Sequence, residues 1–476
     1  MNWAPLVLFR RLPAVPRLLL LSQLAFNVGF YLVVPFLAVH LTEDLALAGG
    51  VVGLVLGVRT FSQQGLFFLG GGLADRFGVK PMVLLGCAIR ITGFLALAAA
   101  TSLPGVLLGA VLVGFAAALF SPAVESALAD QGRQLEVAGV ATRAEVFGLD
   151  AIASKLGSVA GPVLGAVLLA VPFALTCVVA AGVFAVVLAA HARYLPQDLR
   201  TEGSGEEPVL AGWGQVLRNR TFLAFTACYC TYLLSYNQLY LALPVELTRA
   251  TGSQQALGWL FVLAAVLVLL FQMRVTDRAR RAGARRALPF GFLLMAASFL
   301  LVAVCAPLEP PPGPWALAPA VGMVVLLYTG QMVAVPVAQD LVPRLAGERR
   351  LGAHFGFLAS AGGLAVLVGS TGVGALLDRA DTPHPGAAVP WVVLAVFPAL
   401  SAAGLWLLAR RVDPHRAPDG AGHAPAVPAG AGGGLRAPAP AAVQAPGSTG
   451  DRGLAAGRRP RSGAVGPGRE PGAPVG

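Results

Sequence analysis

The sequence predicts an all-α, polytopic membrane protein with about twelve transmembrane helices in two six-helix halves. Of its 476 residues, 56% are hydrophobic and only 12% are charged, whereas a soluble globular protein carries about 25% charged residues. The hydrophobic residues form long runs, each sufficient to cross about 30 Å of hydrocarbon. Basic residues collect in alternate loops between these runs, as the positive-inside rule requires. That asymmetry predicts that both termini are cytoplasmic.

The expected spans follow one another along the first 411 residues. They begin near Leu18, Gly49, Pro81, Pro104, Ala144, Pro172, Thr221, Leu257, Ala287, Ala316, Phe355 and Trp391. Arg10, Arg11 and Arg17 precede a full-length span, which favours an uncleaved signal anchor over a signal peptide. The five cysteines lie in or beside apolar spans and are expected to be small buried residues without a disulfide framework.

Composition divides the chain into four parts. We expect an N-terminal six-helix half over residues 1–192, a polar cytoplasmic loop over 193–220 and a C-terminal six-helix half over 221–411. Residues 412–476 consist mainly of Ala, Gly, Pro and Arg, cannot bury a core and are expected to be disordered. The net charge of +11 belongs largely to loops and tail and does not indicate nucleic-acid binding.

Short segments of the first half recur in the same order in the second. The matches are Tyr31–Pro35 with Tyr240–Pro244, Asp75-Arg76 with Asp277-Arg278, and Phe147-Gly148 with Phe355-Gly356. Their shared order and spacing argue for duplication. Internal repeats with a binding site at their interface are a common plan of transporters.

The loop after the second span reads Gly71-Gly-Leu-Ala-Asp75-Arg76-Phe-Gly78-Val-Lys80. Gly78 permits a tight turn, and Arg76 can form a bidentate pair with a carboxylate. This pattern resembles the signature loop of the major facilitator superfamily, with Val79 where the family prefers Arg. The resemblance implies a helical bundle of two halves and a role for this loop as a conformational gate.

By the same resemblance, Asp130 at the end of the fourth span is the acidic partner of Arg76 in the gate. Residues 277–283 form a weaker copy of the loop, placed where the superfamily repeats it.

The fifth span carries a ladder of small residues. Gly157, Gly161 and Gly165 recur every fourth residue and share one helix face, which allows a neighbouring backbone to approach closely. Pro162 favours a kink. With Gly148, this ladder resembles the antiporter motif of the superfamily's drug:proton antiporters, which implies export.

A narrower resemblance covers most of the first 410 residues. Residues 57–65 and 74–82 are similar to the bacterial MdtH-type multidrug-resistance exporters. Ala110 stands where the general antiporter family often has an Arg, which puts any coupling scheme based on that Arg in doubt.

Charged residues in the spans are costly in lipid and are usually paired or functional. Proton coupling needs a carboxylate that binds and releases a proton as a cavity alternates between wet and dry. Glu125 and Asp150 are the candidates, and the sequence does not decide between them. For each, a permanent ion pair is an equal alternative. Lys155 either faces the cavity or belongs to a buried pair.

An aromatic stripe follows one face of the seventh span and predicts a cavity wall for flat apolar or cationic compounds. Core packing between helices is the alternative. The cavity candidates are Asn27, Tyr31, Arg59, Gln63, Lys155, Tyr229, Tyr232, Tyr236, Asn237, Tyr240 and Gln331.

Three functions compete. The first is a proton-coupled exporter of drugs or small amphipathic molecules in the cell membrane, working by alternating access, with a small-molecule substrate, protons and the lipid bilayer as partners. The second is an importer or uniporter of one metabolite, and the third a non-transporting receptor or scaffold. An enzyme is not expected, because no nucleotide motif, metal cluster or nucleophile motif occurs in the sequence. We expect no cofactor and a monomer.

Overall fold

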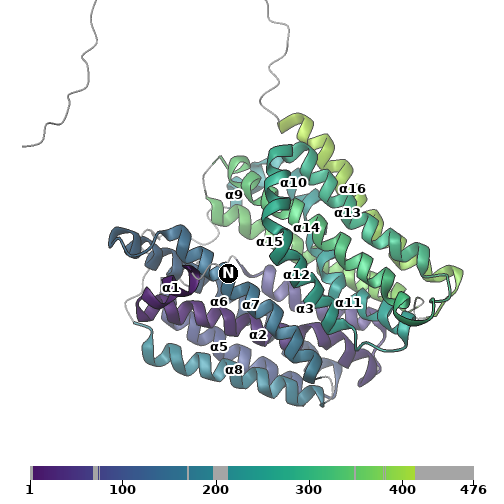
Figure 1. Ribbon diagram of the computed structural model, residues 1–476, viewed down its shortest axis with the longest axis horizontal. Helices are drawn as coiled ribbons and strands as arrows, with labels where there is room; N and C mark the ends of the chain where they lie inside the picture. Colours follow the sequence, from purple (N-terminus) through teal and green to yellow (C-terminus); the bar gives the residue numbers. More distant parts are fainter. Residues whose placement is uncertain are drawn as a thin grey trace, which may run out of the picture. The chain divides into compact units, whose positions relative to one another are not determined.

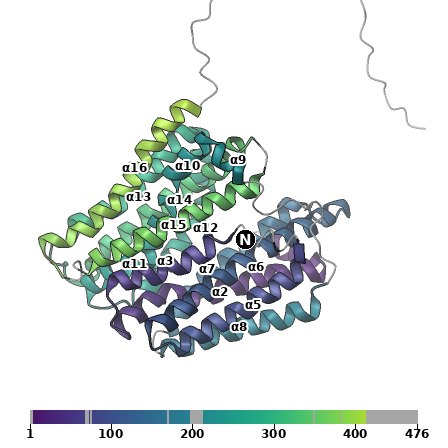
Figure 2. The ribbon, with the colours of Figure 1, turned by 180° about the vertical axis from the view of Figure 1, so that it is seen from behind.

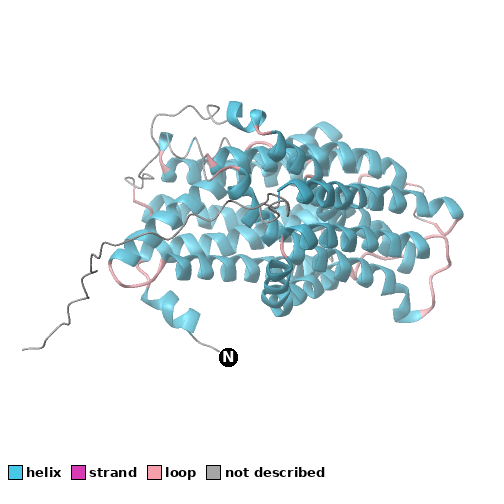
Figure 3. Cartoon of the chain, turned by 90° about the horizontal axis from the view of Figure 1, so that it is seen from above, coloured by secondary structure: helices cyan, strands magenta, loops and turns pink. Residues whose placement is uncertain are grey.

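The computed structural model describes residues 4–67, 73, 76–168, 171–196, 213–347, 350–378, 380 and 382–412. Every regular element in this part of the chain is a helix, as Figure 3 shows. The predicted all-α class is therefore confirmed. The predicted tail beyond Val412, most of the central loop, and Gly71 and Asp75 of the gate loop lie outside the described residues.

A helix lies at each of the twelve expected spans. The N-terminal half contains α1 (Ala4–Arg11), α2 (Ala14–Glu43), α3 (Gly49–Gln64), α5 (Val79–Ala99), α6 (Leu103–Val137), α7 (Arg143–Leu168) and α8 (Phe173–Tyr194). The C-terminal half contains α9 (Trp213–Arg218), α10 (Arg220–Tyr229), α11 (Thr231–Thr251), α12 (Leu257–Ala282), α13 (Ala284–Cys305), η1 (Gly313–Leu317), α14 (Ala318–Leu345), α15 (Leu351–Leu377), η2 (Pro385–Ala388) and α16 (Val389–Val412).

Most of the expected spans are single helices that are long enough to cross a membrane. Among the described residues, nine helices are long and apolar enough to span a bilayer. The seventh expected span differs from the prediction, because it is divided at Cys230 into α10 and α11. Cys230 keeps right-handed helical angles, with φ −58° and ψ −26°. The division is therefore a local loosening rather than a change of direction.

Two groups of helices are visible in opposite views. Figures 1 and 2 both show α2, α5, α6, α7 and α8 together, and α13, α14 and α16 together. Within the first group α2 packs on α7, α5 on α6 and α8, and α3 on α6. Within the second, α13 packs on α14 and α16, and α12 on α14. The halves meet mainly where α3 packs on α15 and where α7 packs on α12.

Each half has its own aromatic core. Phe94, Phe120 and Phe184 are fully buried in the N-terminal half, and Phe292 and Trp391 in the C-terminal half. Other large apolar side chains stay exposed, as on a helix that faces hydrocarbon. In lipid, apolar burial gives no drive for helix association, so close packing and hydrogen bonds hold the bundle together.

The two halves share an unusual backbone conformation at equivalent turns. Gly78 precedes α5 with φ 88° and ψ 162°, and Gly283 precedes α13 with φ 76° and ψ 158°. Both glycines occupy the left-handed side of the φ range, where a side chain would be strained. The paired turns agree with the duplication inferred from the sequence.

The contact between α3 and α15 depends on small residues. A Cβ atom added to Gly53 would overlap the backbone of Ser370, and one added to Gly374 would overlap the backbone of Gly49. The two backbones therefore touch with no side chain between them. This close approach is the tightest type of helix packing available in a membrane.

The predicted glycine face of α7 packs against α2. A Cβ atom on Gly157 would lie 2.6 Å from Asn27 Cβ, and one on Gly161 would lie 2.5 Å from Tyr31 Cβ. Gly165 meets Phe36 in the same way. The ladder thus brings α7 directly behind two of the predicted cavity residues.

An acidic side chain of one half caps a helix of the other. The backbone N–H of Gly49, at the start of α3, donates to Asp378 Oδ1 across 2.7 Å. The N-cap residue Ala48 has no side-chain cap of its own. We expect Asp378→Ala to lower the free energy of unfolding by about 0.5–2 kcal/mol, because a lost N-cap oxygen typically costs that much. Thermal unfolding of the purified protein in detergent measures this.

The matched control is Glu309→Ala. Glu309 is exposed, so its removal should leave the unfolding temperature unchanged. Equal effects of the two substitutions would show that Asp378 acts only through surface charge.

Candidate functional site

A cavity of about 210 Å³ lies where α2, α3, α6 and α11 meet. Seven predicted cavity residues line it: Asn27, Tyr31, Arg59, Gln63, Tyr236, Asn237 and Tyr240. The lining residues that the sequence did not predict are Gln23, Phe26, Phe30, Thr60, Gln64, Ser121 and Leu233. The wall is therefore polar and aromatic. Among the described residues that form it, Arg59 is the one charged side chain.

Arg59 begins a hydrogen-bonded chain that crosses between the halves. Its Nη1 donates to Gln63 Oε1 across 3.2 Å, and its Nη2 donates to Thr60 Oγ1 across 2.7 Å. Thr60 Oγ1 also accepts from Asn237 Nδ2 of α11 across 2.9 Å. Arg59 is only 4% exposed, and its Nε has no hydrogen-bond partner among the described residues. The cavity therefore contains a buried cation with unused donors.

Tyrosines of both halves form a second polar cluster. The hydroxyl groups of Tyr31 and Tyr236 lie 3.3 Å apart, and Tyr240 donates to the Tyr236 hydroxyl across 3.1 Å. Tyr236 and Tyr240 are one turn apart on α11, so they present the same face. Tyr328 of α14 packs edge-on against Tyr236, with ring centroids 6.4 Å apart. These rings and hydroxyls can stack on a flat ligand and hydrogen-bond to its polar groups.

A second buried arginine lies behind the cavity wall and was not predicted as a site residue. Arg90 of α5 is 1% exposed and donates to the Val113 carbonyl oxygen across 3.0 Å. Its Nε and Nη2 have no partner among the described residues. The guanidinium lies over the rings of Phe26 at 4.3 Å, Phe184 at 5.2 Å, Phe94 at 5.6 Å and Phe30 at 5.7 Å. Cation–π interactions with these rings thus offset part of the cost of burying the Arg90 charge.

The two candidate carboxylates lie on neighbouring helices. Glu125 is on α6, one turn after the cavity residue Ser121, and Asp150 is on α7. The two helices pack against each other, and Glu125 is exposed whereas Asp150 is half-buried. Asp150 Oδ1 is buried and has no hydrogen-bond partner among the described residues. Neither residue lines the cavity itself. The structure therefore brings together two residues between which the sequence did not decide.

Lys155 lies apart from this acidic pair. It is exposed on α7 and does not line the cavity, and its backbone oxygen accepts a hydrogen bond from Ser158 Oγ. The described residues show no ion pair of Lys155 with a carboxylate. Its placement favours neither of the roles considered for it.

The aromatic stripe of the seventh span serves two purposes along its length. Tyr236 and Tyr240 line the cavity, whereas Tyr229 stacks on Tyr232 at 5.5 Å and packs edge-on against Phe292 of α13 at 5.8 Å. Tyr229 and Tyr232 do not line the cavity, and neither does Gln331, which is 9% exposed. The part of the stripe that contains Tyr229 and Tyr232 therefore packs between helices, which is the alternative to a cavity wall considered above.

The described part of the gate loop shows a different partner for Asp130. Its Oδ1 accepts from Arg133 Nη2 across 2.7 Å, on the same helix, whereas Arg76 is exposed and lies over the Phe77 ring at 5.5 Å. Asp130 Oδ2 accepts from Gln134 Nε2 across 2.9 Å, so both Asp130 oxygens bond within α6. The described residues show no contact between Asp130 and Arg76, and the role of this pair in the gate stays a prediction. Lys80 donates to the backbone oxygens of residues 192 and 195 and ties the loop to α8.

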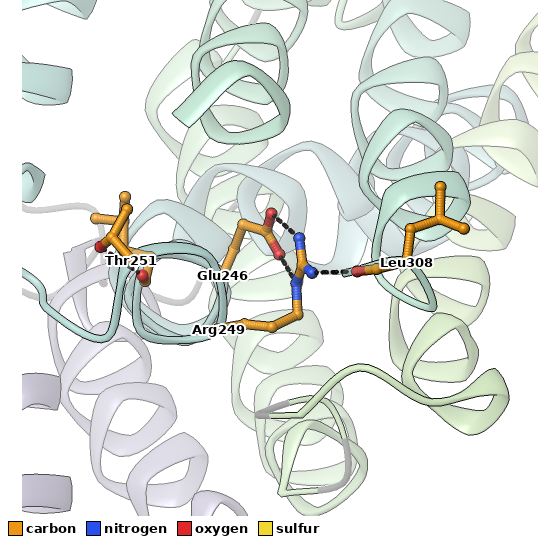
Figure 4. A network of polar contacts seen from close by, with 5 residues as sticks. Glu246, Arg249, Thr251 and Leu308 are labelled. Carbon is orange, nitrogen blue, oxygen red and sulfur yellow. Dashed lines mark hydrogen bonds and ion pairs between the residues drawn. The ribbon is translucent and has the colours of Figure 1, made fainter. Parts of the chain in front are cut away.

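A buried ion pair in α11 was not predicted (Figure 4). Arg249 donates from Nε and Nη2 to the two carboxylate oxygens of Glu246, across 2.8 Å and 2.7 Å. Its Nη1 donates to the Leu308 backbone oxygen across 3.2 Å. The side chains of Arg249 and Glu246 are 2% and 0% exposed. An acid and a base three residues apart in an apolar helix were the signal in the sequence.

A larger hollow of about 1360 Å³ lies among α10, α12, α13, α14 and α16. It shares no residue with the central cavity, and exposed Phe290 and Leu293 form part of its wall. We therefore regard the smaller, polar cavity as the candidate substrate site. The described residues contain no group of His, Cys, Asp and Glu that could hold a metal ion.

Comparison with known proteins gives concordant matches. The family profile described as Major Facilitator Superfamily matches residues 19–370 and 225–445. An uncharacterised MFS-type transporter of Mycobacterium tuberculosis strain H37Rv is 38% identical over 419 residues, which cover 85% of this chain and 95% of that protein. The multidrug resistance protein MdtH of Aeromonas hydrophila is 31% identical over 382 residues, which cover 79% and 90%.

Solved structures share the fold. The nucleoside transporter NupG has a TM-score of 0.69 at 14% identity and covers 84% of this chain and 99% of its own. A peptide transporter, POT, has a TM-score of 0.67 at 17% identity and covers 84% and 95%. At this level of identity the likeness concerns the fold alone.

Proposed function

Because the chain belongs to the major facilitator superfamily, we propose that it uses the family's transport of small molecules for proton-coupled export of drugs or other small amphipathic compounds. Membership makes it a multi-pass membrane transporter rather than an enzyme. The proposal adds direction, coupling ion and substrate type. It includes a monomer in the cell membrane with both termini in the cytoplasm, and rocking of halves 1–192 and 221–411 about the central cavity.

The acidic pair is the observation that carries this proposal. When both carboxylates are charged, Glu125 and Asp150 repel each other, and binding of one proton relieves that repulsion. Glu125 lies one turn from the cavity residue Ser121. Movement of α6 against α7 during alternating access would change the separation and the hydration of the pair. Proton binding and cavity opening would thereby be linked.

The resemblance of the glycine ladder to the antiporter motif supports export, and its packing links α7 to the cavity. Gly157, Gly161 and Gly165 bring α7 against α2 beside Asn27 and Tyr31, so a shift of α7 is transmitted to the cavity wall. Gly148, the first residue of the motif, has no neighbour within 4 Å of an added Cβ atom. The relatives named as multidrug resistance proteins also agree with export.

The test uses inverted membrane vesicles that maintain an inward proton gradient, reported by a pH-sensitive dye. Compounds of cationic, neutral and anionic classes are added to wild type, Asp150→Asn and Glu125→Gln. We expect at least one class to dissipate the gradient in wild type, and one of the two substitutions to abolish this proton movement while ligand binding persists. Lys155→Gln, which removes a charge from the same helix, serves as the matched control.

Two outcomes would contradict the exporter proposal in different ways. Compound uptake into whole cells against a gradient would indicate an importer. If no compound moves protons in wild-type vesicles, the exporter proposal fails.

A further inference from the structure

The central cavity contains positive charge without a matching negative charge. Arg59 lines it and Arg90 lies directly behind it, and both are more than nine-tenths buried. Both guanidinium groups lie near the Phe30 ring, at 5.3 Å and 5.7 Å from its centroid. No carboxylate is among the described residues that line the cavity.

Burial of an arginine without a counter-charge is costly, because the ion loses its hydration. Hydrogen bonds from Arg59 to Gln63 and Thr60 use two of its N–H groups. A guanidinium has five such donors in a planar fork, so three remain, including the unpartnered Nε–H. These donors match the geometry of a carboxylate, which arginine binds through two parallel hydrogen bonds.

The acidic pair does not supply the missing charge. Among the described residues no hydrogen bond or ion pair joins Glu125 or Asp150 to either arginine, and neither carboxylate lines the cavity. The nearest polar groups of Arg59 are uncharged hydroxyls and amides. The cavity is therefore complementary to an anion, in contrast to the cationic compounds that the aromatic stripe suggested.

We infer that the substrate of this transporter carries an anionic group, which Arg59 binds as its counter-ion while Tyr31, Tyr236 and Tyr240 contact the rest of the molecule. This inference rests on the proposed function for its transport step. The cavity of about 210 Å³ is below the roughly 300–1,000 Å³ of pockets for drug-sized ligands, which favours a small organic acid with a flat or apolar body. Arg90 adds positive potential from behind the Phe26 and Phe30 rings without touching the ligand.

The charge balance of the cycle follows. Exchange of one outgoing monoanion for one incoming proton moves two positive charges inward. Exchange of one outgoing cation for one proton moves none. A membrane potential that is negative inside therefore drives both steps of anion export in the same direction.

Binding tests the inference without requiring transport. The purified protein in detergent is titrated with benzoate, its neutral analogue benzamide and its cationic analogue benzylamine, and with the same three classes built on a naphthalene ring. We expect the carboxylates to bind most tightly. Arg59→Gln should weaken carboxylate binding at least about tenfold, since the variant loses charge-assisted hydrogen bonds to the carboxylate. Arg59→Lys should recover part of the preference for anions.

Arg274→Gln is the control, because Arg274 is exposed on α12 and its Nη1 donates to the Leu270 backbone oxygen of the same helix, away from the cavity. It should bind all six probes as wild type does. Equal binding of the three charge classes, or carboxylate binding that is unchanged in Arg59→Gln, would overturn the inference.

A transport measurement separates this result from the proposed function. In proteoliposomes, a potassium diffusion potential should accelerate proton movement that a carboxylate elicits. If protons move only with benzylamine or naphthylmethylamine, proton-coupled export stands and the anion inference is wrong. If carboxylates bind through Arg59 but move no protons, the binding site stands and proton coupling is wrong.

Discussion

Replacement of Arg249 by methionine is expected to lower the free energy of unfolding by about 3–5 kcal/mol. The carboxylate of Glu246 is fully buried, and Arg249 provides both of its side-chain hydrogen bonds (Figure 4). Methionine fills much of the arginine's volume but leaves that carboxylate without a counter-charge. Unfolding in mixed micelles with increasing denaturing detergent, followed by helical circular dichroism, measures the loss.

The chain offers a matched control for this prediction. Arg280 pairs with Asp340, but the side chains are 55% and 46% exposed. Arg280→Met should therefore cost less than about 1 kcal/mol, as exposed ion pairs do. The double replacement of Glu246 by leucine and Arg249 by methionine should recover stability relative to Arg249→Met alone. Equal losses in Arg249→Met and Arg280→Met would contradict the buried pair.

A single methyl group at Gly53 is expected to separate α3 from α15. A Cβ atom there would lie 2.7 Å from the Ser370 carbonyl carbon and 3.2 Å from Thr371 Cα. Because these are backbone atoms, no side-chain rotation relieves the overlap. We expect Gly53→Ala to destabilise the protein by about 1–3 kcal/mol, the usual cost of overpacking, and to reduce cross-linking of cysteines placed across the two helices.

Gly372→Ala on α15 provides the opposite case. Nothing lies within 4 Å of a Cβ atom added at Gly372. Alanine is favoured over glycine in a helix by about 0.5–1 kcal/mol, so this substitution should be neutral or stabilising. If Gly53→Ala behaves like Gly372→Ala in thermal unfolding, the close contact between α3 and α15 is not present in the folded protein.

The sequence predicted the helices well because hydrophobic length is a local property of the chain. It also predicted the glycine face of α7, since a four-residue period fixes which residues share a side. The partner of that face was not predictable, because the period does not say which helix approaches. The structure shows that Gly157 and Gly161 meet Asn27 and Tyr31 of α2.

Seven of the residues that the sequence proposed for a cavity line the central one, and Lys155, Tyr229, Tyr232 and Gln331 do not. Tyr236 and Tyr240 line the cavity, but Tyr229, on the same stripe, packs against Phe292. The spacing of the stripe indicates which side of the helix its residues face, but not how far along the helix a cavity extends. Arg90 was missed as a site residue because three of the four phenylalanines around it, Phe26, Phe30 and Phe184, come from other helices. The functional roles of these residues stay predictions.

At the central cavity, the hydrogen bonds that join the halves are made mainly by uncharged groups. Tyr31 meets Tyr236 and Thr60 meets Asn237 through neutral donors and acceptors. Each such bond makes a net contribution of about 0.5–1.5 kcal/mol to the contact between the halves, because its donor and acceptor bond to water when the contact opens. A membrane potential of about 100 mV does about 2.3 kcal/mol of work on one elementary charge that crosses the membrane. These two hydrogen bonds are thus comparable in energy with the work that such a potential does on one charge, so under the proposed proton coupling the entry of one proton would suffice to offset them.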